Sequence, residues 1–161
     1  MKDDIIIRDG TENDAPFFYN SFLHHYKHGS PHTKYIHDIN YYNELHNIIT
    51  RCLDRKGNVL KFVALKSDPD VVLGYIWANT EIETIYYVYI KKAFREMGIA
   101  KILLQHVFPC APEQVFFPFF TYSAQTLMNK YTNLYFNPYL LDKSVWSHYQ
   151  SKLDDAEDPQ S

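Results

Sequence analysis

Residues 86–104 read YYVYIKKAFREMGIAKILL, and this stretch decides the fold. Its first five residues are aromatic or β-branched, which is typical of a strand, and apolar residues recur at helical spacing after position 98. Arg95, Gly98 and Ala100 form an Arg-x-x-Gly-x-Ala pattern between the two parts. Small residues let a ligand approach the backbone closely, and the first amides of a helix have no partner within that helix. The stretch therefore predicts a loop that binds a pyrophosphate with its backbone, and nearby lysines at positions 91, 92 and 101 add positive charge.

The segments around this stretch alternate between helix and strand patterns. Hydrophobic spacing and turn residues predict a strand at 5–8, helices at 14–29 and 34–53, and strands at 59–65, 71–78 and 83–90. After the loop, we expect a helix, a strand at 115–117, a helix at 123–131 and closing segments at 134–136 and 139–141. The chain length suits one domain over residues 1–150, and the acidic tail 151–161 is expected to be disordered.

The loop and its place in this order resemble the GNAT superfamily of acyl-CoA-dependent N-acyltransferases. The superfamily pattern is Arg/Gln-x-x-Gly-x-Gly/Ala after the fourth strand, and residues 4–142 follow its element order. The resemblance implies an α+β fold with a twisted, mostly antiparallel sheet flanked by helices. Residues 87–95 and 137–141 are also similar to uncharacterised phage and prophage GNAT-like proteins, which implies a viral origin and a place in the host cytoplasm.

The resemblance also implies acetyl-CoA or coenzyme A as cofactor and acetylation of an amine as the reaction. In this fold two central strands separate, and the cofactor pairs with the exposed strand end as an added strand would. We expect this separation near residues 88–90. The predicted cofactor-binding residues are Val88, Tyr89, Ile90, Arg95, Glu96, Met97, Gly98, Ile99, Ala100, Lys101 and Ser123.

Acetylation of an amine requires a base, because a protonated amine has no lone pair. Some GNAT enzymes use a glutamate on the fourth strand, so Glu83 is the predicted base, with Glu81 as a weaker candidate. Tyr86 is a second catalytic candidate, able to orient a substrate or relay a proton. Since neighbouring strand residues face opposite sides, we expect only one of Tyr86 and Tyr87 to face the cleft.

The general acid is harder to place. Many GNAT enzymes carry a tyrosine in the helix after the fifth strand, where this chain has Met128. Tyr131, one helical turn further, is the candidate substitute. The acceptor site is expected to be built from the segment between the first two helices and from the central strands, with Phe22, Tyr26, His28, Tyr35 and Trp77 as substrate-binding residues.

Composition narrows the choice of partners. The formal net charge of −3 argues against a surface that binds nucleic acid, and no apolar run has the length of a membrane span. Cys52 and Cys110 are far apart in sequence, which indicates a reducing cytosol rather than a disulfide framework. Several histidines cluster at residues 24–32, but no carboxylate or cysteine completes a ligand pattern, so no metal is expected. The expected assembly is a monomer or a homodimer.

Three interpretations remain open at this point. The main one is a cytosolic acetyl-CoA-dependent N-acetyltransferase acting on a small-molecule, peptide or protein amine. The second is an inactive protein of the same fold that holds coenzyme A or a partner protein. The third is a nucleic-acid-associated module that stacks bases on its tyrosines and phenylalanines, against which the net charge counts.

Overall fold

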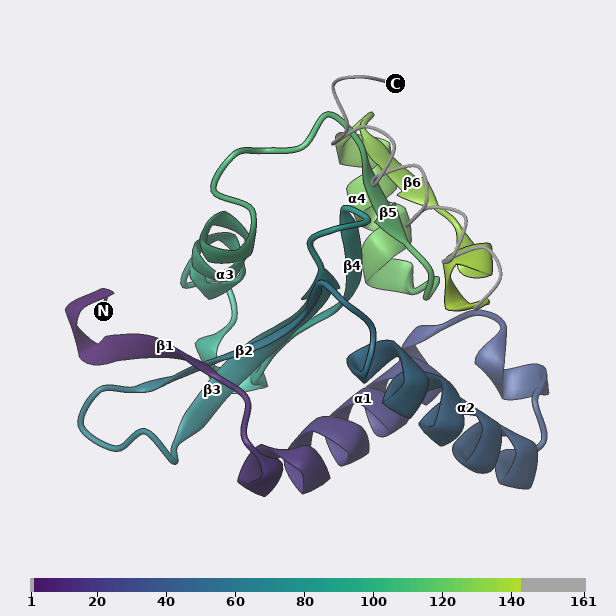
Figure 1. Cartoon of the computed structure of the whole chain (residues 1–161), viewed down its shortest axis with the longest axis horizontal. Helices are drawn as coiled ribbons and strands as arrows, with labels where there is room; N and C mark the ends of the chain where they lie inside the picture. Colours follow the sequence, from purple (N-terminus) through teal and green to yellow (C-terminus); the bar gives the residue numbers. More distant parts are fainter. Residues whose placement is uncertain (1, 143–161) are drawn as a thin grey trace, which may run out of the picture.

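The computed structural model describes residues 2–142, which form a six-stranded sheet flanked by helices (Figure 1). The strands lie side by side in chain order: β1 Ile5–Asp9, β2 Asn58–Leu65, β3 Val72–Asn79, β4 Thr84–Ile90, β5 Val115–Phe117 and β6 Leu134–Phe136. The first four strands pair antiparallel, whereas the β4–β5 and β5–β6 pairs are parallel. The predicted fold class is confirmed, as are the order and approximate bounds of the strands.

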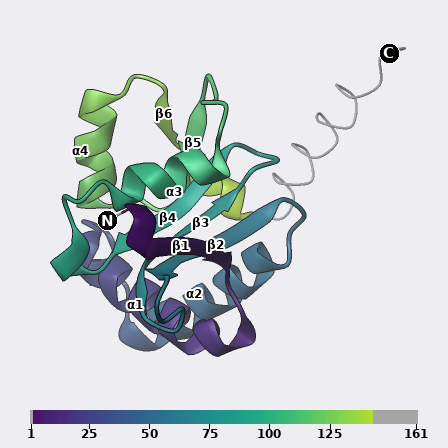
Figure 2. The same ribbon diagram turned by 90° about the vertical axis from the view of Figure 1, so that its left-hand side faces the viewer.

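Helices cover both faces of the sheet. They are α1 Ala15–Gly29, α2 Asp38–Leu53, α3 Ile99–Val107 and α4 Tyr122–Lys130. The first two lie together on one face and α3 lies on the other, as two views at right angles show (Figures 1 and 2). The prediction was least accurate at the start of α2, because residues 33–35 form a separate 3₁₀ turn and Ile36 is extended. The expected tail at 151–161 lies outside the described residues.

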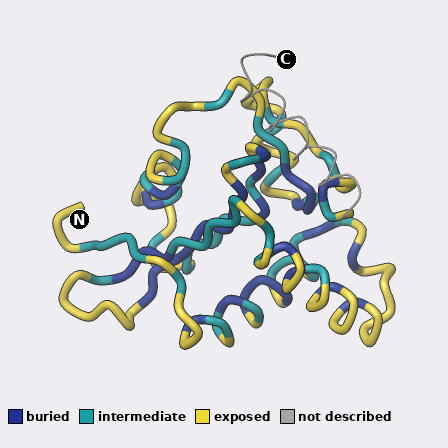
Figure 3. Tube along the Cα trace, viewed as in Figure 1, coloured by how far each residue is buried: buried dark blue, intermediate teal, exposed yellow. Residues whose placement is uncertain are grey.

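The core has two unequal parts on opposite faces of the sheet. The larger part, facing α1 and α2, is mostly aromatic and includes Phe18, Phe22 and Trp77. The smaller part, facing α3, is mostly aliphatic and includes Ile76 and Leu103. Because both faces are covered, every residue of β3 is buried, and the buried segments of the chain run through the middle of the molecule (Figure 3).

A buried carboxylate ties β1 to the start of α1. Both oxygens of Asp14 accept hydrogen bonds from the Arg8 guanidinium, at 2.7 and 2.9 Å, and the Thr11 amide donates to Asp14 at 2.8 Å. The Arg8 hydrogen bonds, helped by those from Thr11, lower the pKa of Asp14 to about 2. The chain thereby reverses direction between the first strand and the first helix.

The sheet divides between β4 and β5. These strands pair at a single position, Thr84 with Phe116, supported by a hydrogen bond from the Phe116 amide to the Glu83 carbonyl at 3.0 Å. Beyond this point toward Ile90 no further pairing joins the two strands in the described part of the chain. The strands therefore separate along the second half of β4, as predicted for residues 88–90.

Candidate functional site

The second half of β4 presents toward β5 backbone groups that pair with no other strand among residues 2–142. The Lys91 amide donates to Leu73 of β3, and backbone groups alternate sides along an antiparallel strand. Tyr89 therefore bonds to β3 as Lys91 does, whereas the amides and carbonyls of Val88 and Ile90 point to the open side. This edge can pair with an extended amide-containing ligand, as an added strand would.

The loop that follows β4 presents a second set of free amides. Ile102 donates to the Gly98 carbonyl at 3.1 Å, so the amides from Gly98 to Lys101 precede the first closed turn of α3. Gly98 caps this helix with φ +79°, and a Cβ at this position would meet no other atom within 4 Å. The loop is thus open to a ligand that approaches the start of the helix.

Arg95 connects the open edge of β4 with the loop that carries the free amides before α3. Its side chain donates from Nε to the Ile90 carbonyl at 3.0 Å, which holds the loop against the end of the open edge. Glu96, Met97 and Lys101 are exposed, whereas Ile99 is buried and anchors the helix to the core. The predicted cofactor residues on β4 and in the loop are thereby brought together on one side of the gap.

Ser123, the remaining predicted cofactor residue, lies in the first turn of α4, where it is exposed. The preceding Thr121 caps this helix by accepting from the Ala124 amide at 3.0 Å. Because α4 follows β5, Ser123 comes from the other side of the gap.

A bulge in β4 corrects the expectation about its tyrosines. Trp77 pairs with Tyr87 and Ala78 pairs with Ile85, so Tyr86 is an extra residue without a partner on β3. Both tyrosines consequently face α1 and α2. The ring of Tyr86 stacks on that of Trp77 with centroids 4.3 Å apart, and the ring of Tyr87 meets that of Phe22 with centroids 5.0 Å apart. Tyr86 is 2% exposed and Tyr87 is half-buried, so Tyr86 is packed in the core rather than open to a cleft.

The hydroxyls of both tyrosines remain protonated at neutral pH. Burial raises the pKa of Tyr86, and burial together with the neighbouring Tyr89 raises the pKa of Tyr87 to about 12. Neither side chain can therefore serve as a base near neutrality.

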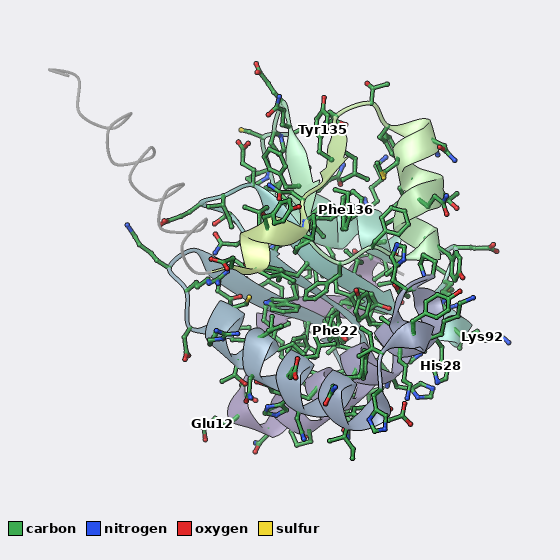
Figure 4. The ribbon with its side chains drawn as sticks, turned by 90° about the vertical axis from the view of Figure 1, so that its right-hand side faces the viewer. Glu12, Phe22, His28, Lys92, Tyr135 and Phe136 are labelled. Atoms are coloured by element: carbon green, nitrogen blue, oxygen red, sulfur yellow. The ribbon has the colours of Figure 1, made fainter. Side chains whose placement is uncertain are left out.

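Two of the predicted acceptor residues also lie in the core. Phe22 and Trp77 have no exposed surface, so neither side chain can contact a substrate in this structure, contrary to the expectation. Both pack in the core between the sheet and α1. Figure 4 shows Phe22 inside the molecule and His28 at its outer surface. Tyr26 is half-buried and contacts Phe119 at 5.1 Å, whereas Tyr35 is 80% exposed.

Tyr131 lies at the C-terminal end of α4, and whether it acts as an acid stays a prediction. It follows the last residue of α4, and Asn133 two residues later accepts from the amide of Val115, where β5 begins. The separation opens instead beyond the Phe116 pairing, toward the end of β5. Tyr131 is thus placed about one helix length away, on the order of 15 Å for ten residues.

Glu83 lies in the turn before β4, not on the strand. Its backbone is left-handed with φ 48°, and its side chain is exposed. The carboxylate is thus at the surface, whereas the side chains of Tyr86 and Trp77 are buried in the core. Whether this carboxylate takes part in the chemistry stays a prediction.

Two further residues contact β4, or α1 from the loop after β5, and were not predicted. Phe119, in the loop after β5, packs against Phe22 of α1. His25 of α1 contacts Tyr89 of β4, with ring centroids 4.7 Å apart. Helical periodicity assigned His25 no role, because only the packing of α1 against the separated strands brings it to β4.

The described residues contain no group of three histidines, cysteines or carboxylates arranged to hold a metal ion. In the same part of the chain, no helix combines the length and apolar character needed to cross a membrane.

The chain is similar to several solved structures, and the similarity to the first of them supports the fold. A Pyrococcus furiosus protein provisionally assigned as an acetyl transferase is 14% identical, with 91% of each chain covered and a TM-score of 0.52. Similarity extends to YycN of Bacillus subtilis, also provisionally assigned as an acetyltransferase, at 14% identity, 91% and 89% coverage and a TM-score of 0.49. YncA of Salmonella typhimurium, determined with its cofactor acetyl-CoA, is 16% identical over 66% of this chain and 62% of its own, with a TM-score of 0.42.

No curated protein sequence matches the chain at a significant level. The sequence pattern of the acetyltransferase (GNAT) family, however, matches residues 16–121, which is well over half of the chain. That region includes nearly all of α1, then α2, strands β2 to β4, the loop with Gly98, α3 and β5. The chain therefore belongs to the acetyltransferase (GNAT) family.

Proposed function

We propose that this protein is an acetyl-CoA-dependent N-acetyltransferase whose acceptor is a primary amine of a small molecule, a peptide or a protein. Acetyltransferases of its family use acetyl-CoA. The observation that carries the proposal is the continuity between the open edge of β4 and the free amides at the start of α3. This arrangement suits a ligand with an amide-containing arm and a pyrophosphate.

The residues present fit that ligand. Val88 and Ile90 offer backbone groups to the pantetheine arm, and the amides from Gly98 to Lys101 offer donors to the pyrophosphate. Lys101 adds positive charge beside these donors, and Ser123 offers a hydroxyl from the opposite side. Acetyl-CoA supplies an activated acetyl group as a thioester, and the chain must bind it, admit the amine and remove a proton.

Two measurements test the proposal. Calorimetry with acetyl-CoA and with coenzyme A should show binding in the micromolar range or tighter, and release of free thiol should depend on an added amine. The amine panel should contain a polyamine, an aminoglycoside, lysine peptides and peptides with a free N-terminus. Absence of heat with both ligands would remove the proposal. Heat without thiol release from any amine would favour the inactive coenzyme A-binding alternative.

Other parts of the interpretation remain predictions from the sequence. They include Glu83 as the base, the similarity to phage proteins and a cytoplasmic location. The acceptor, within the broad class of amines, has to be found by the panel.

A further inference from the structure

The second half of α1 lies beneath the gap between β4 and β5. The ring of Phe22 contacts that of Tyr87 on the β4 side and that of Phe119 on the β5 side, with ring centroids 5.0 and 5.1 Å apart. His25 follows Phe22 by three residues, so it lies almost one turn further along the helix. Its ring contacts Tyr89 on the separated half of β4, which places the imidazole beside the strand that would bind the cofactor.

One nitrogen of His25 is fixed by the helix. His25 Nδ1 lies 2.7 Å from the Ser21 carbonyl oxygen. A carbonyl can only accept a hydrogen bond, so Nδ1 carries the proton and donates it. In the neutral imidazole, Nε2 then holds the free lone pair, and it has no hydrogen-bond partner among residues 2–142. His25 is therefore oriented with its basic nitrogen available.

The ring also borders an open space. Phe17, Ser21, His25 and Tyr89 contribute to an open hollow of about 590 Å³ along α1. The ionisable groups around His25 are His24 on the same helix, Tyr89 of β4, Tyr42 of α2 and Lys91, whose ammonium lies over the Phe17 ring. No carboxylate borders the hollow in the described part of the chain.

We propose that His25 is the general base of the acetyl transfer, a role that rests on the proposed function. Nε2 of His25 takes one proton from the ammonium group of the acceptor, directly or through one water. The neutral amine then forms a bond to the carbonyl carbon of the thioester as the carbon–sulfur bond breaks. Coenzyme A leaves as a thiolate and receives the second amine proton, so the products are the amide, the thiol and protonated His25.

Position favours His25 over Glu83. The carboxylate lies in the turn where β4 and β5 are still paired, whereas the imidazole adjoins Tyr89, beyond the point of separation. Imidazole also exchanges its proton near neutral pH, where amine acetylation requires a base that is largely unprotonated.

The test compares three variants with the wild type. His25→Asn retains a side-chain amide able to donate to Ser21 but removes the basic nitrogen, and His25→Gln is a second variant with a different reach. His46→Asn is the matched control, because His46 is exposed on α2 and its ring likewise contacts one tyrosine, Tyr19, at 4.4 Å. Glu83→Gln tests the alternative base.

We expect the His25 variants to lower kcat/KM by about 10²-fold or more, the usual contribution of a general base. Their acetyl-CoA affinity and Tm should match the wild type, and the fall in rate at acidic pH should disappear. His46→Asn should remain within about threefold of wild type and keep the wild-type pH profile, whereas loss of the acidic limb in Glu83→Gln alone would assign the base to Glu83 and overturn the proposal.

A second readout does not depend on turnover. In the complex with coenzyme A, which carries no acetyl group, adding the acceptor amine should shift the ring NMR signals of His25 but not those of His46. Full activity with an unchanged pH profile in either folded His25 variant would overturn the assignment, as would a His25 ring signal unaffected by the amine. A wild type without turnover on any amine would instead remove the proposed function, and this inference with it.

Discussion

At the level of single residues, Gly98 controls access to the start of α3. Its left-handed φ of +79° is a conformation that β-branched residues avoid, and the space beside it is open. We expect Gly98→Val to weaken acetyl-CoA binding at least tenfold, because its side chain adds both strain and bulk where the pyrophosphate would approach. Calorimetry on the folded variant measures this change.

Two further variants separate these effects. Asn tolerates the left-handed conformation, so weaker binding by Gly98→Asn isolates the effect of bulk. Gly29→Asn introduces a side chain into open space away from this loop and should leave acetyl-CoA affinity unchanged. Wild-type affinity in both Gly98 variants would show that the cofactor does not approach this glycine.

Asp14 makes a second residue-level prediction, concerning pH and stability. Its pKa is about 2 in the folded protein and near 3.8 in the unfolded chain. A lowered carboxyl pKa stabilises the fold above pH 4, and this contribution is lost as the pH falls through 2. Asp14→Asn should therefore lower the free energy of unfolding by about 1–2 kcal/mol at pH 7, and by roughly half as much at pH 3.

Urea unfolding at the two pH values measures this difference. Asp9 provides the control, because its contact with Lys61 is also an ion pair of a carboxylate but its side chain is 80% exposed. Asp9→Asn should change stability by less than about 1 kcal/mol. A loss in Asp14→Asn that is equal at pH 7 and pH 3 would contradict the proposed titration.

At the level of elements, the bulge in β4 decides which side chains can reach the gap. The hydroxyl of Tyr86 is buried near Cys52 and Arg55, and no described residue meets it with hydrogen-bond geometry. Tyr86→Phe should therefore leave the free energy of unfolding unchanged or raise it by about 1 kcal/mol, with turnover unaffected. Urea unfolding and thiol release measure the two quantities.

Tyr75 is the matched control for this change. Its hydroxyl is also buried, but it shares a hydrogen bond with Ser21 at 2.9 Å. Tyr75→Phe should lower the free energy of unfolding by about 1 kcal/mol. A large loss of turnover in Tyr86→Phe without loss of stability would restore Tyr86 as a catalytic candidate.

The elements also show what the sequence can and cannot predict. Within residues 2–142, periodicity located each strand and each of the four α-helices, and the glycine pattern located the loop before α3, because these signals are local. The bulge at Tyr86 is different, since it depends on how β3 pairs with β4 and no turn residue marks it. Alternation along the strand therefore assigned Tyr86 and Tyr87 to opposite faces, when they share one.

The candidate site was harder to predict than the fold because its side chains come from distant segments. Aromatic residues such as Phe22 and Trp77 are equally suited to a core and to a cleft, and burial alone separates the two uses. The loop before α3 and the separation of β4 from β5, on which the proposed cofactor site rests, were predictable because they depend on spacing along the sequence. The neighbourhood of His25 was not, because it depends on the crossing of α1 beneath the separated strands.

At the level of the whole molecule, ligand binding should protect selected amides from hydrogen exchange. Pairing of acetyl-CoA with the open edge should slow exchange at Val88 and Ile90, and contact with the loop should slow exchange at Ala100 and Lys101. Amides between β1 and β2 serve as an internal control, because these strands are fully paired. Hydrogen exchange followed by NMR would contradict the binding mode if all protection fell outside β4 and α3.

The sheet consists of two parts, β1–β4 and β5–β6, which are joined at one paired position, Thr84 with Phe116. Because no continuous ladder of hydrogen bonds joins the two parts, the angle between them depends on side-chain packing, in which Phe22 contacts Phe119. A larger or smaller residue at position 119 would therefore widen or narrow the gap between β4 and β5 without breaking a backbone hydrogen bond. If the gap admits the acceptor as proposed, changes in this one loop would select acceptors of different size, while the proposed acetyl-CoA-binding edge of β4 is preserved.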